Sequence, residues 1–319
     1  MKVLVTGGAG FIGSRLTMAL ADAGHRVVVA DNLVATGSLR LLEDHASRIE
    51  FHHADIQNPA DFRDLGGDFD VVYHLAASFA NELSIEDPQL DFGTNVLGTQ
   101  NVLDFARRAG CGLFVYTGSS SSYGAVRVPF EEDGPLEPTT PYARTKFEAE
   151  ERVRASGLRH VTFRLFNVYG PGDYPGAYRN AIPNMFATAR EHGKVRIFGA
   201  EATRDFTFVD DVVDILLSAE RGVGGVFNLG TGREVRIASL ARFILKLSGL
   251  DSHNIRIEMP RSWDNVTRRV ASVDRLRACF GRVPSTHLEF GLAATAEWLE
   301  RTGHLPTRTP ELGFGVPAE

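Results

Sequence analysis

Short apolar runs alternate with amphipathic stretches along the first half of the chain. The runs are rich in Val, Ile and Phe, and their length is typical of buried strands. They predict strands at residues 2–7, 25–31, 49–55, 69–76, 113–119 and 159–167. Helical patterns lie between them, for example at 12–24 and 97–110. This alternation predicts an α/β fold with a doubly wound parallel sheet that helices cover on both faces.

The pattern changes after residue 168, where a turn-rich loop is followed by a helical stretch near 181–192 and a possible strand at 194–199. Residues 204–232 return to a strand and helix pattern that suits the main sheet. We therefore expect a main domain of residues 1–167 with a return segment of about 204–232. Residues 168–203 and 233–302 are expected to form a smaller C-terminal, substrate-binding lobe. Residues 303–319 are expected to form a tail that is laid on the surface or disordered.

Composition narrows the partners and the compartment. The formal net charge of -6, with no basic run, argues against nucleic acid or an anionic membrane as a partner. No apolar run reaches membrane-spanning length, and the glycine-interrupted start of the chain is interpreted as mature structure. The 2 cysteines, Cys111 and Cys279, form no CxxC motif, which favours a reducing compartment, the cytoplasm.

A glycine-rich loop follows the first predicted strand. In "TGGAGFIG", Gly7, Gly10 and Gly13 let the backbone turn tightly and approach a pyrophosphate, and the next helix supplies amide hydrogens. Asp31 ends the next strand 18 residues after Gly13. A carboxylate there accepts both ribose hydroxyls and repels a 2′-phosphate. The sequence predicts a Rossmann-type domain that binds NAD rather than NADP. An ordinary strand–helix turn is the alternative.

Two further strand ends suit the same cofactor. Asp55, after the third strand, is placed to meet the adenine amine, and "HLAA" (74–77) to pass near the second phosphate. Each alone reads as strand end and packing, so both roles depend on the glycine loop.

Tyr142 and Lys146 are separated by four positions at the start of a predicted helix, so they share one face. A free tyrosine has a pKa of about 10 and needs help to act as a base at neutral pH. At about 4 Å and an effective dielectric near 20, an ammonium attracts a phenolate by roughly 4 kcal/mol before desolvation. Lowering the phenol pKa by two to three units is therefore feasible. Such a phenolate takes a proton from a sugar hydroxyl while a nicotinamide accepts the hydride.

A third group should orient that hydroxyl, and "TGSSSSYG" (117–124) ends a strand upstream, where a parallel sheet would place it. The alternative for Tyr142 and Lys146 is an exposed helix pair. The glycine loop favours proton transfer.

These motifs together resemble the extended short-chain dehydrogenase/reductase family, specifically its NAD-dependent nucleotide-sugar epimerases and dehydratases. The likeness spans nearly the whole chain, through "VTGGAGFIG", "HLAA", "SSSSYG", "PYARTK", "RLFNVYGP", "RDFTFVDDVV", "FNLGTG" and "RSWD". It implies a Ser–Tyr–Lys centre of Ser119, Tyr142 and Lys146, in a cleft between the lobes. It also implies a homodimer formed by the helices near 97–110 and 142–155.

The resemblance assigns the binding residues as well. Those expected to hold NAD are Gly7, Gly10, Phe11, Ile12, Gly13, Asp31, Asn32, Asp55, Ile56, Leu75, Ala76, Ala77, Asn95, Tyr142, Lys146 and Phe166. Those expected to hold the nucleotide sugar are Phe79, Asn81, Ser119, Ser121, Asn167, Asn180, Val195, Phe198, Arg204, Arg261 and Asp264. Within this set, Asn167 and the two arginines meet the diphosphate, Asp264 meets the ribose, and Val195 and Phe198 border the base. An ion pair, a strand-end cap or a helical salt bridge is the structural alternative for the polar members.

The choice of reaction depends on the two residues after the catalytic hydroxyl. The family's dehydratases carry an Asp–Glu pair there and its uronate decarboxylases a Glu at the second place, whereas this chain has Ser120 and Ser121. The missing carboxylates favour 4-epimerisation of a UDP-hexose or UDP-uronate through a bound 4-keto sugar. A dehydratase, a decarboxylase and a keto-sugar reductase stay as alternatives, and a non-catalytic NAD-binding regulator is the alternative of another class.

Several details stay open at this point. Uridine is the commoner base with these motifs, and thymidine and cytidine remain alternatives. The substituent at C6 is undetermined, and Arg179 meets either a carboxylate or solvent. His52 and His53 have no third ligand at metal spacing, so no metal site is expected.

Overall fold

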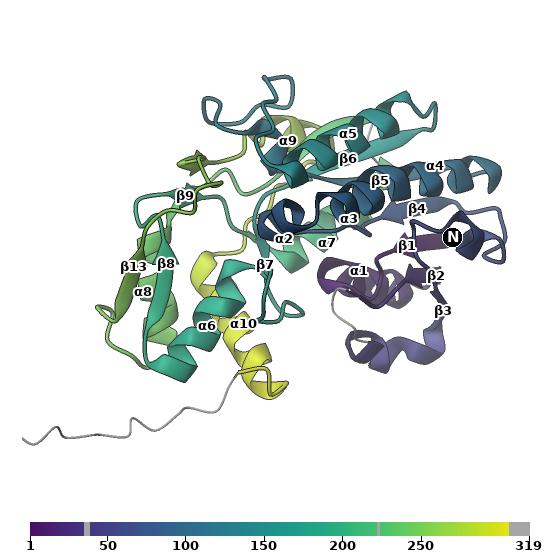
Figure 1. The fold of residues 1–319 in the computed structure, drawn as a ribbon. Coiled ribbons are helices and arrows are strands. Elements are labelled where there is room, and N and C mark those ends of the chain that lie inside the picture. The colour runs from purple at the N-terminus through teal and green to yellow at the C-terminus, as the bar shows by residue number, and fades with distance from the viewer. Residues whose placement is uncertain (35–38, 222–223, 306–319) are drawn as a thin grey trace, which may run out of the picture.

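Seven parallel strands form the main sheet of the computed structural model, which describes residues 1–34, 39–221 and 224–305. The order across the sheet is β11-β6-β5-β4-β1-β2-β3 (Figure 1). Its strands are β1 (Lys2–Thr6), β2 (Arg26–Asp31), β3 (Ile49–His53), β4 (Val71–His74), β5 (Leu113–Ser119), β6 (His160–Leu165) and β11 (Gly225–Leu229). The chain leaves β1 toward β2 and returns on the other side at β4, so a ligand crevice is expected at the carboxyl ends of β1 and β4.

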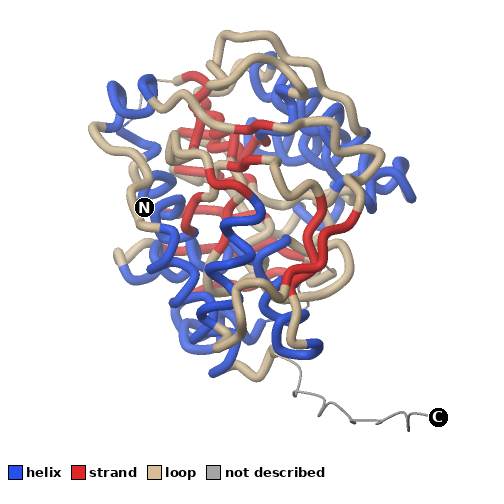
Figure 2. Tube along the Cα trace, turned by 90° about the vertical axis from the view of Figure 1, so that its left-hand side faces the viewer, coloured by secondary structure: helices blue, strands red, loops and turns tan. Residues whose placement is uncertain are grey.

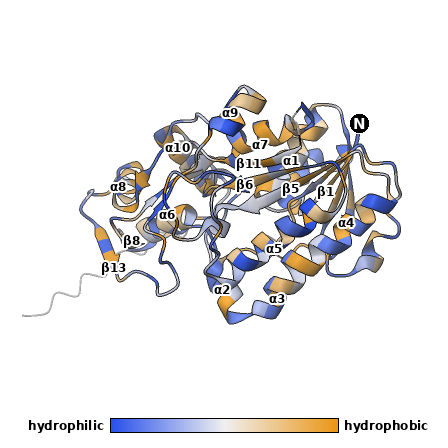
Figure 3. Ribbon diagram, turned by 90° about the horizontal axis from the view of Figure 1, so that it is seen from above, coloured by the Kyte–Doolittle hydropathy of each residue, from blue (hydrophilic) through white to orange (hydrophobic). Residues whose placement is uncertain are grey.

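Helices cover both faces of this sheet, which confirms the predicted α/β class. Figure 3 shows α4 (Thr99–Arg108) and α5 (Pro141–Ala155) on one face and α1 (Phe11–Asp22) and α7 (Val209–Leu217) on the other. The strands alternate accordingly: Leu4 packs into the core on the side of α4 and α5, and Val3 and Val5 into the core on the side of α1 and α7. Shorter helices at α2 (Asn81–Glu86) and α3 (Pro88–Phe92), and a π-helix at Gly93–Gly98, lead into α4.

A smaller lobe lies beside the carboxyl ends of the sheet. It contains α6 (Ala181–His192), α8 (Ile237–Leu247) and α10 (Leu288–Arg301), and the parallel pair of β8 (Val195–Phe198) and β13 (Ile255–Glu258). Figure 2 shows this pair apart from the main sheet. The lobe has its own apolar core, which includes Phe186, Ile197, Leu240 and Leu292.

Short strands join the two parts of the molecule. β9 (Thr203–Arg204) lies between β12 (Val235–Arg236) and β14 (Arg268–Arg269), and β7 (Val168–Tyr169) pairs with β10 (Thr207–Phe208). In the β9–β14 pair, Arg204 is the register partner of Arg269. Residues far apart in the sequence are thereby placed side by side where the two parts meet.

One helix within the segment predicted for the smaller lobe packs with the main sheet. Helix α9 (Asp274–Phe280), which falls within the 233–302 segment expected in the smaller lobe, packs instead against β11. Leu276 belongs to the core on the side of α1 and α7, and Phe280 packs against that core. The apolar face of this short helix is therefore buried by the main sheet. Of the predicted tail, residues 306–319 lie outside the described residues.

Among the described residues, no helix is long and apolar enough to cross a membrane. In the same part of the chain, no group of three or more His, Cys, Asp or Glu side chains is arranged to hold a metal ion.

Candidate active site

The glycine loop connects β1 to α1 in a conformation that only glycines allow. Gly7 has φ of +70°, and a Cβ there would stand 2.6 Å from the backbone nitrogen of Ala76 at the end of β4. A Cβ at Gly13 would stand 2.0 Å from the carbonyl oxygen of Gly7. Side chains at these positions would fill the space between the loop and the start of the helix. Glycines at these positions therefore allow the tight turn and the close packing of the loop that the sequence predicts, and the binding of a pyrophosphate there stays a prediction.

Asp31 at the end of β2 lies against this loop. One carboxylate oxygen accepts from the backbone N–H of Ala9 at 3.0 Å and the other from that of Leu33 at 2.8 Å. Each oxygen keeps lone-pair capacity for a ribose hydroxyl. Asn32, the residue after Asp31, donates to a carboxylate oxygen of Asp55 at 3.2 Å. Asp55, the other predicted acidic residue, therefore lies close to the end of β2. These residues fit the adenosine half of NAD, with a fixed negative charge where NADP would carry a phosphate.

The other predicted cofactor residues lie along the same edge. Buried His74 at the end of β4 interacts with Thr6 at 2.7 Å and Thr99 at 3.0 Å, and burial lowers its pKa to about 3. It is therefore neutral and fixes the strand end that carries Leu75 and Ala76. Asn95 donates to the carbonyl oxygen of Ser78 at 3.1 Å, which anchors the segment that follows "HLAA".

Helix α5, which carries Tyr142 and Lys146, begins where its sequence predicts. Thr140 caps it by accepting from the N–H of Ala143 at 3.2 Å, and Pro141 occupies the first turn. This start places Tyr142 in the first turn and Lys146 one turn later, with Lys146 buried. Ser119, at the end of β5, is buried as well and forms a hydrogen bond with Tyr142. The three predicted catalytic residues therefore come from one strand end and one helix.

The electrostatics of Tyr142 differ from the sequence-based expectation. Lys146 donates from Nζ to the carbonyl oxygen of Thr117 at 2.8 Å and lies over the Tyr116 ring at 4.5 Å. Burial raises the pKa of Tyr142, and the hydrogen bond from Ser119 and the charge of Arg269 offset part of that rise. Arg269, rather than Lys146, is the cation that lowers the pKa of the phenol in this structure. Burial lowers the pKa of Lys146 itself to about 8.

The predicted phosphate and ribose residues gather on the smaller-lobe side. Arg204 donates from Nη2 to both oxygens of Asp264, at 3.0 and 2.8 Å. Arg261 forms an ion pair with Glu82 at 2.7 Å and lies over the Phe198 ring at 4.5 Å. These contacts bring two candidate phosphate arginines, the candidate ribose carboxylate and the candidate base-bordering aromatic ring into one region.

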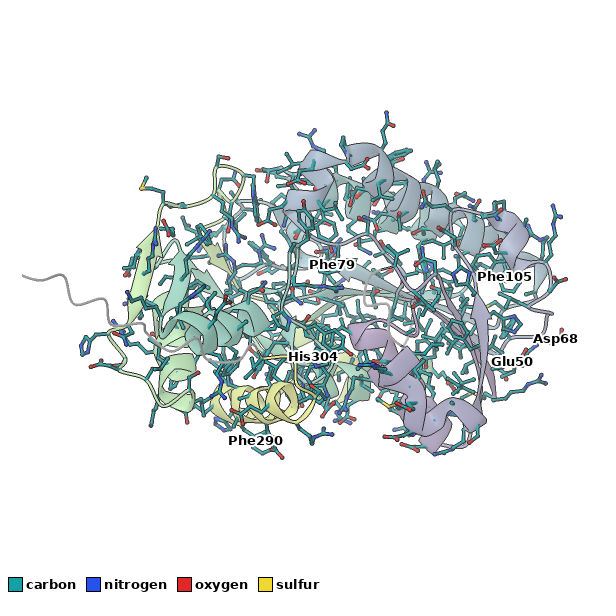
Figure 4. The ribbon with its side chains drawn as sticks, turned by 60° about the horizontal axis from the view of Figure 1, so that its bottom comes forward. Glu50, Asp68, Phe79, Phe105, Phe290 and His304 are labelled. Atoms are coloured by element: carbon teal, nitrogen blue, oxygen red, sulfur yellow. The ribbon has the colours of Figure 1, made fainter. Side chains whose placement is uncertain are left out.

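The remaining predicted substrate residues are divided between the two sides. Phe79 is labelled near the centre of Figure 4, and Arg179 lies over its ring at 5.1 Å. Asn81 accepts from the Thr140 cap at 2.6 Å, and Asn167 donates to the carbonyl oxygen of Asp205 at 3.0 Å. The side chain of Val195 is fully buried in the core of the smaller lobe, so it supports this region without facing a ligand.

Three polar residues of this region are absent from the sequence-based set. They are Glu82, which pairs with Arg261, and the two residues Asp173 and Arg269. The arginine doublet at 268–269 closely follows Asp264, but one sequence alone does not say which of the two turns inward.

Asp173 gives a testable pH dependence. It is buried and accepts from Asn180 at 2.8 Å, and burial raises its pKa from 3.8 to about 7. The folded chain therefore binds more protons than the unfolded chain between about pH 4 and 7, so this group makes the protein less stable as the pH rises through that window. Between pH 5 and pH 6.5, this group should lower the free energy of unfolding of the native protein by about 2 kcal/mol, and we expect Asp173→Asn to show no such decrease.

Urea unfolding of both proteins at a series of pH values measures this difference. The asparagine keeps an acceptor oxygen for Asn180, which makes the variant close to isosteric. Parallel stability curves for the two proteins across pH 5–7 would contradict a buried, protonatable Asp173.

Comparison with known proteins agrees with this site. Residues 3–230 match the NAD dependent epimerase/dehydratase family. A UDP-glucose 4-epimerase of Mycolicibacterium smegmatis is 35% identical over 313 residues, which cover 93% of this chain and 98% of that protein. The UDP-glucose 4-epimerase of Thermotoga maritima, solved with UDP-glucose, has a TM-score of 0.88 at 30% identity. The match covers 95% of this chain and 99% of that chain.

A third relative carries both ligand types. The UDP-glucuronic acid 4-epimerase of Bacillus cereus, solved with UDP-glucuronic acid and NAD, has a TM-score of 0.86 at 28% identity. The match covers 95% of this chain and 100% of that one. With the glycine loop, Asp31 and the Ser119–Tyr142 pair in place, this chain belongs to the NAD dependent epimerase/dehydratase family.

Proposed function

We propose that this protein is a nucleotide-sugar 4-epimerase that acts on a UDP-hexose or a UDP-uronate. The observation that carries the proposal is the set of side chains next to the catalytic pair. Ser119 and Tyr142 stand together at the end of β5, and the next two residues, Ser120 and Ser121, are buried serines. An epimerase needs a proton acceptor at O4 and nothing that titrates at C5 or C6, whereas elimination of water requires an acid and a base there.

The chain's own groups divide the work in this proposal. Bound NAD⁺ supplies a hydride acceptor that later returns the hydride to the sugar. Tyr142 takes the proton from the O4 hydroxyl and gives it back, and Ser119 holds that hydroxyl in line through its hydrogen bond with the phenol. Arg269 places positive charge near the phenol, which favours its ionised form when the proton leaves, and Lys146 lies one helical turn after Tyr142.

The nucleotide is held by the smaller lobe in this proposal. Arg204 and Arg261 meet the two phosphates, because planar guanidinium groups suit phosphate oxygens. Asp264 meets the uridine ribose, and Phe198 borders the base. The ion pairs with Asp264 and Glu82 keep the two guanidinium groups in place when no phosphate is bound.

Assembly and compartment belong to the same proposal. We infer a homodimer formed through α4 and α5, because Leu90, Phe92 and Leu97 are exposed apolar residues on the segment that leads into α4. Cys111 and Cys279 are both free thiols, which suits a reducing compartment such as the cytoplasm.

Product analysis tests the function. Purified protein is incubated with UDP-glucose, UDP-galactose and UDP-glucuronate, and the products are separated by chromatography. We expect interconversion at C4 with at least one of these substrates. A 4-keto-6-deoxy sugar would indicate a dehydratase, and a UDP-pentose with carbon dioxide would indicate a decarboxylase; either product contradicts the proposal.

A further inference from the structure

Among the described residues, Arg269 of the candidate site forms no ion pair with a carboxylate, although the charge of Asp264 acts on it. Arg204 is paired with Asp264, Arg261 with Glu82, and neither ion pair includes Arg269. Its one hydrogen bond runs from Nη1 to the hydroxyl oxygen of Ser121 at 3.1 Å. Its Nε is buried and has no hydrogen-bond partner. A half-buried guanidinium with an unpaired, buried Nε gains from an acceptor supplied from outside the chain.

The position of Arg269 says which part of a sugar it would meet. Its charge acts on Tyr142, and its hydrogen-bond partner Ser121 donates its backbone N–H to the hydroxyl oxygen of Ser119 at 3.1 Å. The guanidinium therefore stands beside the pair that handles O4. In a hexose, C4 is flanked by C3, which carries a neutral hydroxyl, and by C5, which carries C6. A carboxylate next to the reacting carbon can only be C6.

The surrounding charges strengthen this assignment. Arg204 is the register partner of Arg269 across β9 and β14. Burial and, to a smaller extent, the charge of Arg204 lower the pKa of Arg269 to about 10. The charge of Asp264 offsets part of this lowering, but Asp264 is hydrogen-bonded to Arg204, so two cations share one carboxylate in a partly buried place. A negatively charged ligand group there would offset both the desolvation and the repulsion. Arg179, the other candidate for a sugar carboxylate, already lies over Phe79 and interacts with Asp173.

We propose that Arg269 and Ser121 bind the C6 carboxylate of the sugar, and that the substrate of this protein is therefore a UDP-uronate rather than a neutral UDP-hexose. The guanidinium donates from Nε and Nη to the two carboxylate oxygens, and the Ser121 hydroxyl donates to one of them. This inference rests on the proposed 4-epimerase activity and selects one of the two substrate classes left open there.

The test measures epimerisation of two substrate pairs by the native protein and by Arg269→Gln. One pair is UDP-glucuronate with its 4-epimer, and the other is UDP-glucose with UDP-galactose. We expect the native kcat/KM for UDP-glucuronate to exceed that for UDP-glucose by about 100-fold, the upper range for hydrogen bonds to a charged group. We expect Arg269→Gln to lower kcat/KM for both substrates, because the phenol loses this positive charge, and to lower kcat/KM for UDP-glucuronate by a further factor of about 100, so that most of the preference disappears. Arg268→Gln is the matched control, because Arg268 is exposed and pairs with Glu234 on the surface at 2.6 Å.

Other outcomes overturn the inference. If Arg269 met a phosphate or served only the phenol, Arg269→Gln would reduce kcat/KM for both substrates by the same factor. A native protein that prefers UDP-glucose would also overturn the inference, while leaving the proposed 4-epimerase intact, and this comparison holds even if the variant does not fold. If neither pair is epimerised, the proposed function fails. Calorimetric binding of UDP-glucuronate against UDP-glucose then decides the carboxylate site separately.

Discussion

Replacing Tyr142 with Phe is expected to lower turnover by about 10²–10⁴-fold, the contribution usual for a positioned general acid or base. The change removes one oxygen atom, which exchanges a hydrogen bond with Ser119 and lies within the field of Arg269. No other phenol of the described residues stands beside Ser119, so the proton of O4 loses its acceptor. The glycine loop and Asp31 are untouched, and NAD binding should persist.

Turnover of the preferred UDP-sugar and calorimetric titration of NAD measure the two parts of this prediction. Tyr169→Phe is the matched control, because it removes the same atom from a tyrosine that packs in the smaller lobe and donates weakly to Leu288 at 3.4 Å. The control should keep turnover within a few fold. Full activity in Tyr142→Phe would mean that another group takes the proton, and loss of NAD binding would mean that the phenol is structural.

The sheet and its cofactor edge are predictable because they depend on local pattern. Apolar runs of strand length, helical stretches between them and glycines at a strand end each report on a few neighbouring residues. Those signals place Gly7, Gly13 and Asp31 together before any contact is known, since parallel strands bring their carboxyl ends to one edge. The Thr140–Pro141 start of α5 is equally local, and it fixes Tyr142 and Lys146 on one helix face.

The charges around the phenol are not predictable in the same way, because they come from pairings across long stretches of chain. Arg269 reaches Ser121 through the short β9–β14 pairing, a contact between residues separated by 148 positions. The i, i+4 spacing of Tyr142 and Lys146 also leaves the direction of the ammonium undetermined. In the fold, it turns to the Thr117 carbonyl and the Tyr116 ring.

The same limit applies to the boundary of the smaller lobe. The composition of residues 274–280 does not distinguish the two apolar cores of the fold, and helix α9 packs with β11 rather than with α8 and α10. Val195 is a similar case. Strand alternation turns Val195 and Ile197 into the core, and it leaves Phe198 half-buried beneath Arg261.

The largest expected effect on stability comes from a buried ion pair behind the catalytic helix. Arg164 of β6 donates from Nε and Nη2 to the two carboxylate oxygens of Glu150, at 3.0 and 2.6 Å. Its Nη1 donates to the hydroxyl of Tyr123 at 2.8 Å and to the carbonyl oxygen of Glu132 at 3.1 Å. Both charged side chains are almost fully buried, at 3% and 1% exposed. Glu150 lies one helical turn after Lys146, so this pair ties α5 to the sheet.

We expect Arg164→Met to lower the free energy of unfolding by about 3–5 kcal/mol, because it leaves a buried carboxylate without its partner. Urea unfolding monitored by circular dichroism measures the change. Arg277→Met is the matched control, since Arg277 and Asp274 form an exposed pair on α9, and its loss should lower the free energy by at most about 1 kcal/mol. The double variant Arg164→Met, Glu150→Gln removes both charges and should recover part of the lost stability. If the double variant were as unstable as the sum of the two single variants, the loss would reflect packing and hydrogen bonds rather than an uncompensated charge.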